Sequence, residues 1–323
     1  MAPPFTIRPL TGADIATVTG WARQEGFAPG AGDLSIYRQT DRQGLWLGCL
    51  GEEPVGCIAG VRYNAAYGFI GLFLVVPQQR GRGFGVSLWR HALQHLADLP
   101  CIGLEAAPDR IDDYAGWGFA PASPTIRWQR DSHNLAAGTA GAATTAAATL
   151  GGPSLAVQPL AVPPFAAGQG PAAEPAWCLL EGSAIPEAVV QRFDAQREPS
   201  PRPHFLHQWL QHPAGSVLAL LDRQGRCRGF GRIRPCLLRD GEGWRIGPLV
   251  ADAPAVAGAL LQGLLQRHPG VVLIDVPGAN LQAAPLLEPL GFRSVSRTLR
   301  MYRGPAPRAT LAEVYGLACL ELG

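Results

Sequence analysis

Apolar and amphipathic stretches follow one another in the same order twice along the chain. Because a period of two indicates a strand and a period near 3.6 a helix, each stretch predicts an element. In the first half the predicted strands are 5–10, 45–50, 54–63, 69–75, 101–106 and 125–129, and the predicted helices are 86–99 and 109–116. In the second half the predicted strands are 217–222, 229–235, 244–250, 271–276 and 294–302, and the predicted helices are 186–194, 203–211, 254–267 and 279–290. The pattern indicates an internal duplication of about 140 residues.

A segment rich in Ala, Gly, Thr and Pro and nearly free of charge separates the two repeats. Such a composition cannot bury enough side-chain surface to offset its ordering entropy, so it is typical of a linker. The expected organisation is therefore a first domain at 1–132, a linker at 133–174 and a second domain at 175–323, in agreement with a length of 323 residues.

Charge and cysteine content narrow the class of protein. The net charge of +2 is too small to favour nucleic acid or a membrane surface as partner, and all 27 basic residues are arginine. The seven cysteines never form a CxxC pair, which indicates buried free thiols in a reducing compartment. No signal-peptide pattern or run of transmembrane length is present, so a cytoplasmic protein is predicted.

Two further polar patterns predict ordinary surface. His91 and His95 lie four residues apart on a predicted helix, but no third ligand is near them, so we expect no metal site. The arginines within 226–239 alternate with apolar residues, which predicts the solvent face of an antiparallel hairpin.

The stretch from Val75 to Gly85 carries the clearest chemistry. It joins a buried strand to an amphipathic helix through a turn with three glycines and two arginines, Arg80 and Arg82. Glycines let backbone N–H groups converge on oxygen atoms at a helix N-terminus, so this turn predicts a cradle for a phosphorylated ligand.

The turn and a second motif resemble a known family. Arg80 to Gly85 reads Arg-Gly-Arg-Gly-Phe-Gly, and Tyr114 to Phe119 reads Tyr-Ala-Gly-Trp-Gly-Phe about thirty residues later. Both are similar to motifs of the GCN5-related N-acetyltransferases (GNAT superfamily). The whole chain resembles the tandem bacterial type with a YitH-like second domain, through the segments Arg245 to Leu249, Ile274 to Pro277 and Leu320 to Gly323.

The resemblance implies an α/β (α+β) fold in which each half has a mixed, mostly antiparallel sheet flanked by helices. It further implies acetyl-CoA as cosubstrate, no metal, and direct attack on the thioester by a primary amine of a small molecule or peptide. The pantetheine would follow a strand edge and the pyrophosphate would lie in the glycine loop. The implied cofactor-binding residues are Leu74, Val75, Val76, Arg80, Gly81, Arg82, Gly83, Phe84 and Gly85.

Amine attack needs a base for the amine and an acid for the departing thiolate. The resemblance implies Tyr114 as the acid, although a tyrosine that merely packs on a helix is the alternative. Glu25 and Glu105 are candidate bases, and a water chain or the backbone could replace them, so the base stays unassigned.

The two halves depart from the family in opposite ways. In the first, Ala107 stands where an asparagine is common. In the second, Asn280 is present, but 251–257 contains no glycine and Asp252 would repel a pyrophosphate, so we expect weak or no CoA binding. Asp275 and Asn280 are candidates for a substrate role, with helix capping as the alternative.

A non-catalytic acyl-CoA-binding or regulatory module is the rival interpretation, because no base stands out. A different nucleotide in the same loop is a third, weakened by the lack of a Gly-Lys-Ser/Thr ending and of Rossmann-type repeats.

Overall fold

The computed structural model describes residues 3–132 and 177–323, and the expected linker at 133–174 lies outside them. The first half contains the strands β1 (Phe5–Pro9), β2 (Leu45–Leu50), β3 (Glu53–Arg62), β4 (Tyr67–Val75), β5 (Cys101–Ala106) and β6 (Ala120–Asp131), and the helices α1 (Ile15–Gln24), α2 (Asp33–Thr40), α3 (Phe84–His95) and α4 (Ile111–Ala115). The second half contains the strands β7 (Trp177–Glu181), β8 (Ser216–Asp222), β9 (Cys227–Leu237), β10 (Glu242–Ala251), β11 (Val271–Pro277), β12 (Arg293–Arg303) and β13 (Val314–Gly316), and the helices α6 (Glu187–Asp194), α7 (Pro203–Gln211), α8 (Pro254–Arg267) and α9 (Ala283–Leu287). The predicted mixed, mostly antiparallel fold with flanking helices is confirmed.

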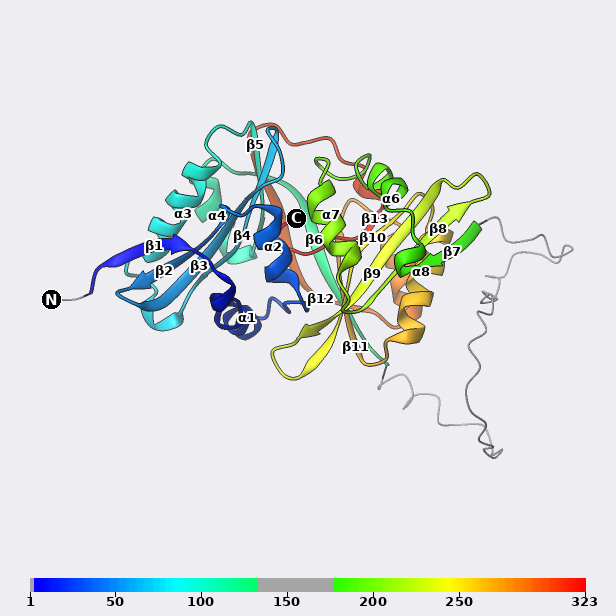
Figure 1. Ribbon diagram of the computed structural model, residues 1–323, viewed down its shortest axis with the longest axis horizontal. Helices are drawn as coiled ribbons and strands as arrows, with labels where there is room; N and C mark the ends of the chain where they lie inside the picture. Colours follow the sequence, from blue (N-terminus) through cyan, green and yellow to red (C-terminus); the bar gives the residue numbers. More distant parts are fainter. Residues whose placement is uncertain (1–2, 133–176) are drawn as a thin grey trace, which may run out of the picture.

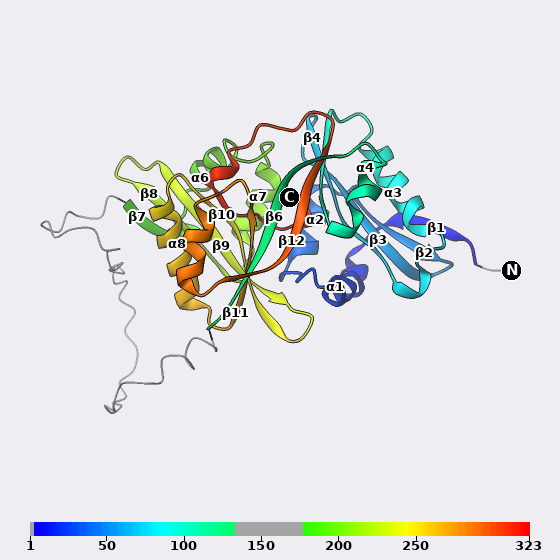
Figure 2. The same ribbon diagram turned by 180° about the vertical axis from the view of Figure 1, so that it is seen from behind.

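The two halves share one sheet, in the order β1-β2-β3-β4-β5-β12-β6-β11-β10-β9-β8-β7, with β13 added on β10. Each half gives its last long strand to the other. β12 of the second half pairs with β5, and β6 of the first half pairs with β11. These two strands also pair with each other at the centre of the molecule (Figures 1 and 2). The two sheets expected from the sequence are therefore continuous.

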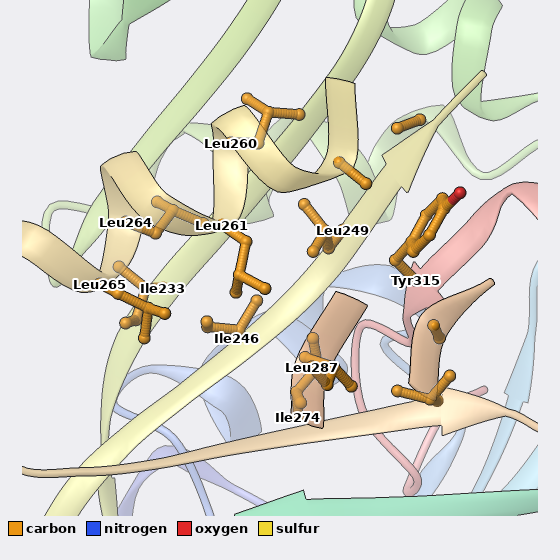
Figure 3. Close-up of a cluster of buried hydrophobic side chains, with 14 of the residues drawn as sticks. Ile233, Ile246, Leu249, Leu260, Leu261, Leu264, Leu265, Ile274, Leu287 and Tyr315 are labelled. Atoms are coloured by element: carbon orange, nitrogen blue, oxygen red, sulfur yellow. The ribbon is translucent and has the colours of Figure 1, made fainter. Parts of the chain in front are cut away.

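Helices cover both faces of this sheet. In the second half α8 presents Leu260, Leu261, Leu264 and Leu265 at helical spacing to strands β9, β10 and β11, and Leu287 of α9 joins them (Figure 3). In the first half α3 packs in the same way on β2 to β5. A further cluster joins both halves, because Phe205 and Trp209 of α7 pack with residues of α1, α2 and β4.

The arginines of β9 correct the sequence interpretation of this hairpin. Arg226 at its turn is exposed as expected, but Arg232 and Arg234 are fully buried. Their alternation with apolar residues is real. However, the face on which they lie is covered by α7, whose Trp209 ring stacks under both guanidinium groups. The face that looked like solvent surface is an interface between the halves.

Buried ion pairs cross that interface. Arg234 of β9 binds Asp33 of α2 through two hydrogen bonds of 2.7 and 3.0 Å. Arg127 of β6 binds Asp275 of β11 through bonds of 2.7 and 3.0 Å, and Arg245 of β10 binds the same carboxylate at 2.8 Å. Such pairs offset their desolvation only in this kind of well-bonded geometry.

Neither a membrane-spanning helix nor a cluster of metal ligands occurs within residues 3–132 and 177–323. None of their helices combines the length and apolar character that crossing a bilayer requires. No three His, Cys, Asp or Glu side chains among these residues gather as a set of metal ligands.

Replacing Asp33 tests how much its ion pair with Arg234 stabilises the folded protein. We expect Asp33→Ala to lower the free energy of unfolding by about 3–5 kcal/mol, because Arg234 is left buried without its counter-charge. Urea denaturation measures the change. Asp98→Ala is the matched control, since Asp98 binds Arg62 with a side chain that is 74% exposed, and its midpoint should stay near the wild-type value. Equal shifts in the two variants would contradict the prediction.

Candidate active site

A wedge opens between β4 and β5. The two strands pair in parallel only from Tyr67 and Cys101 to Ile70 and Leu104. Beyond this, Leu72 adopts a positive φ of 47° and β4 bends away in a bulge opposite β3. The edge of β4 that carries Leu74 and Val75 therefore faces β5 without a partner strand among the described residues. It is available to an extended ligand.

The glycine loop lies directly after this edge. Gly81 and Gly83 have φ values of +76° and +84°, and a Cβ at either position would meet no atom within 4 Å. Gly83 is the N-cap of α3, followed by Phe84 and Gly85. The N–H groups of the first turn have no intrahelical acceptor and carry the positive end of the helix dipole. The loop is thus open, exposed and suited to an anion.

The two arginines of the loop are held differently. Arg80 donates from Nε to the carbonyl of Val75 at 2.8 Å and from Nη2 to Glu25 at 2.5 Å. This contact ties the end of α1 to the loop. Arg82 lies 4.9 Å from the ring of Phe84 and contacts Gln79, so its charge stays at the exposed mouth of the loop.

Tyr114 lies on the α3 face of the sheet. Its ring is 5.1 Å from that of Trp89, which also contacts Phe73 of β4 and Phe119. Burial raises the pKa of Tyr114 to about 12. The phenol is therefore protonated at neutral pH and able to donate a proton to a stronger base.

The two candidate bases are both engaged. Glu25 is bound to Arg80, as described above. Glu105 is buried and accepts three hydrogen bonds, from Arg300 at 2.7 Å, Thr298 at 2.7 Å and Thr125 at 2.9 Å. Two of these donors come from the exchanged strand β12. Glu105 is thus built into the junction of β5, β12 and β6.

Asp275 and Asn280 also have partners within the protein. Burial alone would raise the pKa of Asp275, but the charges and hydrogen bonds of Arg127 and Arg245 outweigh it and hold the pKa at about 2. Asn280 donates to the carbonyl of Val314 at 3.0 Å and accepts from the N–H of Gln282. The hydrogen bond from Gln282 N–H to the Asn280 side chain is of the kind expected if Asn280 caps the following helix. A substrate role for Asp275 and Asn280 stays a prediction.

The corresponding wedge of the second half is filled. β10 and β11 pair in parallel only up to Ile246 and Ile274, and β13 then pairs with β10 at Leu249 and Val250. Asp252, at the start of α8, is bound to Arg228 at 2.5 Å. The chain itself thus occupies the strand edge that a pantetheine would use. The sequence did not reveal β13, because three residues carry no measurable periodicity.

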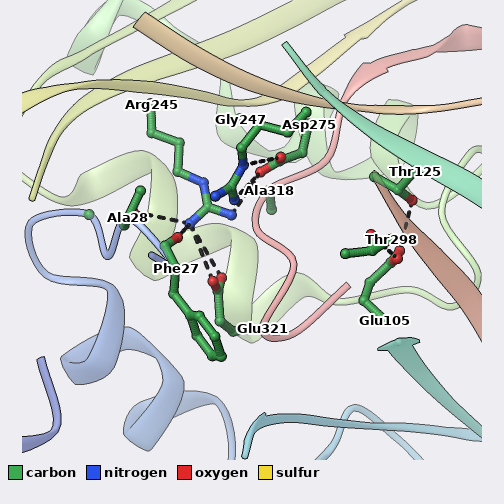
Figure 4. Close-up of polar contacts among 12 residues, drawn as sticks. Phe27, Ala28, Glu105, Thr125, Arg245, Gly247, Asp275, Thr298, Ala318 and Glu321 are labelled. Atoms are coloured by element: carbon green, nitrogen blue, oxygen red, sulfur yellow. Dashed lines mark hydrogen bonds and ion pairs between the residues drawn. The ribbon is translucent and has the colours of Figure 1, made fainter. Parts of the chain in front are cut away.

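The loop between α1 and α2 is held by one arginine from each half, Arg127 of β6 and Arg245 of β10. Arg245 donates to the carbonyls of Phe27 and Ala28 at 3.1 and 3.2 Å, and Arg127 donates to that of Gly26 at 3.2 Å (Figure 4). Ala28 has a positive φ of 54°, so this conformation needs such support. Sequence reasoning missed both arginines, since each stands in an otherwise apolar strand pattern.

A cavity of about 290 Å³ lies beside this loop. Its walls come from both halves, through residues 29–35 of the loop and α2 and residues 235–237 of β9. The loop is fixed there by a bridge between Gly30 and Cys236 and by the hydrogen bond from Ala31 N–H to the carbonyl of Pro235.

Comparisons with known proteins agree with this geometry. Residues 17–119 match the acetyltransferase (GNAT) family, and residues 190–316 match an acetyltransferase (GNAT) domain, so the two matches cover more than half of the chain. The chain is 26% identical to the holothin acyltransferase of Pseudoalteromonas sp. (strain SANK 73390), over 99% of this chain and 95% of the relative.

Two solved structures share the fold along the whole chain. A candidate acetyltransferase from Pyrococcus horikoshii superimposes with a TM-score of 0.73 at 21% identity, over 99% of this chain and 96% of the other. A tandem GNAT protein from the clavulanic acid biosynthesis pathway gives a TM-score of 0.57 at 15% identity, over 94% and 99%. The YitH-like character of the second half stays a prediction.

The open and the filled wedge should respond differently to coenzyme A. We expect amide hydrogen exchange at 81–86 to slow when coenzyme A is added, because the free N–H groups there gain acceptors. Exchange at 251–257 should not change. Peptide-resolved exchange mass spectrometry compares the two segments in one experiment. Protection of 251–257 would contradict the assignment of the second wedge as filled.

Proposed function

This chain belongs to the GNAT superfamily of acyltransferases and carries two GNAT domains in tandem. We propose that it transfers an acetyl group from acetyl-CoA to a primary amine. The observation that carries the proposal is the exposed glycine loop at the N-terminus of α3, directly after an unpaired strand edge. Among the described residues of the second half, the corresponding strand edge is paired with β13 and 251–257 contains no glycine. We therefore assign the reaction to the first wedge.

In this proposal the ligand uses two backbone features. The N–H groups of 81–85 hold the pyrophosphate, helped by the charge of Arg82, and the pantetheine amides pair with the edge at Leu74 to Val76. Arg80 has a structural role in this proposal, because its hydrogen bond to Glu25 fixes the loop relative to α1.

Tyr114 is the proposed acid. When the amine attacks the thioester carbonyl, the C–S bond breaks and the thiolate takes the phenolic proton. The proposal is supported by its neighbour Trp89, which belongs to α3, the helix that begins directly after the glycine loop, and which also contacts Phe73 of β4.

The acceptor is proposed to be a small-molecule amine. The loop between α1 and α2 is fixed by both halves, and the cavity beside it is lined by residues of both halves and has a volume of about 290 Å³, which suits a small molecule better than an extended peptide. One relative is named for acyl transfer to holothin, which supports a small molecule and leaves longer acyl groups as a variant of the proposal.

A negative charge in the glycine loop tests the pyrophosphate site. We expect Gly83→Asp to weaken acetyl-CoA binding by on the order of 100-fold, because a carboxylate would face the pyrophosphate. Isothermal titration calorimetry measures the affinity. Gly225→Asp is the matched control: Gly225 also has a positive φ, +72°, and open space around it, but lies in the turn between β8 and β9. Equal losses in both variants would contradict the assigned site.

Replacement of Tyr114 tests the chemical step. We expect Tyr114→Phe to lower kcat by roughly 100-fold or more while acetyl-CoA affinity changes little, because only the proton donor is lost. Thiol release against a panel of amines provides the rate. Since the pKa of about 12 keeps the phenol protonated, the ratio of the two rates should stay constant from pH 7 to 10.

Tyr315→Phe, in the core of the second half, is the control for loss of a buried hydroxyl. Unchanged turnover in Tyr114→Phe would contradict the assigned acid. Tight acetyl-CoA binding by the wild type without release for any amine would favour the non-catalytic binding module instead.

A further inference from the structure

The last seven residues of the sequence run from the second wedge to the first. Leu317 donates its N–H to the carbonyl of Asp275 at 2.8 Å, directly after β13. Arg234 then binds the carbonyl of Ala318 at 3.1 Å, and Tyr63 binds that of Leu322 at 2.9 Å. The segment 317–323 is almost wholly buried along this path. It therefore belongs to the interior that both halves enclose.

This path brings Glu321 against β4 where the first wedge opens. A Cβ at Gly71 would collide with the carbonyl oxygen of Glu321, so the close approach requires glycine there. Gly71 follows the last residue of β4 that pairs with β5. The Cα of Glu321 lies 2.9 Å from the position of that Cβ. The side chain of Glu321 therefore starts beside the wedge and extends from there toward Arg245 and Tyr37.

The hydrogen bonds of the nearby carboxylates set Glu321 apart. Those of Glu105 and Asp275 each accept three bonds of 2.7 to 3.0 Å. Among residues 3–132 and 177–323, the contacts of the Glu321 carboxylate are with Arg245, at 3.4 and 3.5 Å (Figure 4), and with Tyr37, at 3.5 Å. A carboxylate has room for about four good hydrogen bonds, and these contacts are long. Glu321 thus keeps acceptor capacity that its neighbours have used.

We propose that Glu321 binds the ammonium group of the acceptor and removes its proton. The inference rests on the proposed function and supplies the base that Glu25 and Glu105, both held in short hydrogen bonds, do not. It also identifies the substrate class as an amine that is protonated at neutral pH, since a buried carboxylate with free acceptor capacity favours a cation.

The proton transfers balance. The ammonium gives one proton to Glu321, and the neutral nitrogen forms a bond to the thioester carbonyl carbon. The C–S bond breaks, and the thiolate takes the proton of Tyr114. The new amide nitrogen loses its second proton, which returns through solvent to the phenolate, and Glu321 releases its proton to solvent. The sum is ammonium plus thioester giving amide, thiol and one proton.

Several charged or titratable groups surround the segment that carries Glu321. They come from α2, β9, β10, β11 and its own segment: Asp33, Tyr37, Arg234, Arg245, Asp275 and Cys319. Asp33 and Asp275 are paired with arginines, and burial raises the pKa of Tyr37 and Cys319. Glu321 is also paired with an arginine, but its contact with Arg245 is longer, at 3.4 Å.

Glu321→Gln in the full chain tests the inference, because the amide keeps an oxygen for Arg245 but cannot take a proton. The readout is kcat/KM for a primary amine from pH 6 to 10, followed as thiol release with saturating acetyl-CoA. We expect a loss of about 100-fold at pH 7 that shrinks to within about threefold near the pKa of the amine, where the amine deprotonates in solution. A structural role would give a loss independent of pH.

Matched variants separate the outcomes. Glu321→Asp keeps a carboxylate base and should retain the pH dependence of the wild type, even if its rate is lower. This variant keeps the test valid if Glu321→Gln folds less stably than the wild type. Glu313 lies shortly before the segment 317–323, and its carboxylate binds Arg197. Glu313→Gln should leave the pH profile unchanged. Equal activity of Glu321→Gln and wild type at pH 7, or the predicted loss in Glu105→Gln alone, overturns this inference. Wild-type protein that releases no thiol with any amine overturns the proposed function itself.

Discussion

The exchange of β6 and β12 is the constraint on which the rest of this structure depends. Each strand satisfies backbone donors and acceptors of the other half, β12 along β5 and β6 along β11. The two strands also pair with each other, so neither half has a complete sheet without its partner. One edge of β5 borders the open wedge, and its other edge is held by β12 of the second half. Glu105 of β5 receives two of its hydrogen bonds from β12.

The interface created by this exchange is filled with arginine–carboxylate pairs rather than with a purely apolar core. Burial of charges is unfavourable unless the geometry satisfies nearly all donors, and arginine suits this because its planar guanidinium can bind several acceptors at once. Arg245 illustrates the point: it binds Asp275 on one side and the carbonyls of Phe27 and Ala28 on the other. Apolar side chains would tolerate many relative orientations of the halves. These directional bonds fix one orientation and, with it, the loop between α1 and α2.

Duplication has thus given two similar wedges with different roles. The first is open, with a glycine loop behind it, and is the proposed site of acyl transfer. The second is occupied by β13, and the segment after β13 continues into the first half to place Glu321 beside Gly71. The second half therefore acts as a scaffold in the proposed mechanism. It supplies the strand β12, Arg245, which binds the loop between α1 and α2, and the carboxylate of Glu321.

The sequence by itself determined the features that depend on neighbouring residues. Periodicity located most strands and helices of both repeats but not α1, α2, β7 and β13. The spacing of Gly81, Gly83 and Gly85 after an apolar strand predicted the open turn before α3. Local geometry follows from local sequence, so these predictions needed no tertiary information. The tertiary structure alone decided what depends on contacts between distant segments. The exchange of strands leaves no periodic signal, because a strand pattern does not name its partner. Burial of Arg232 and Arg234 likewise depends on α7, which lies elsewhere in the sequence, and the three residues of β13 become a strand only because β10 offers an unpaired edge.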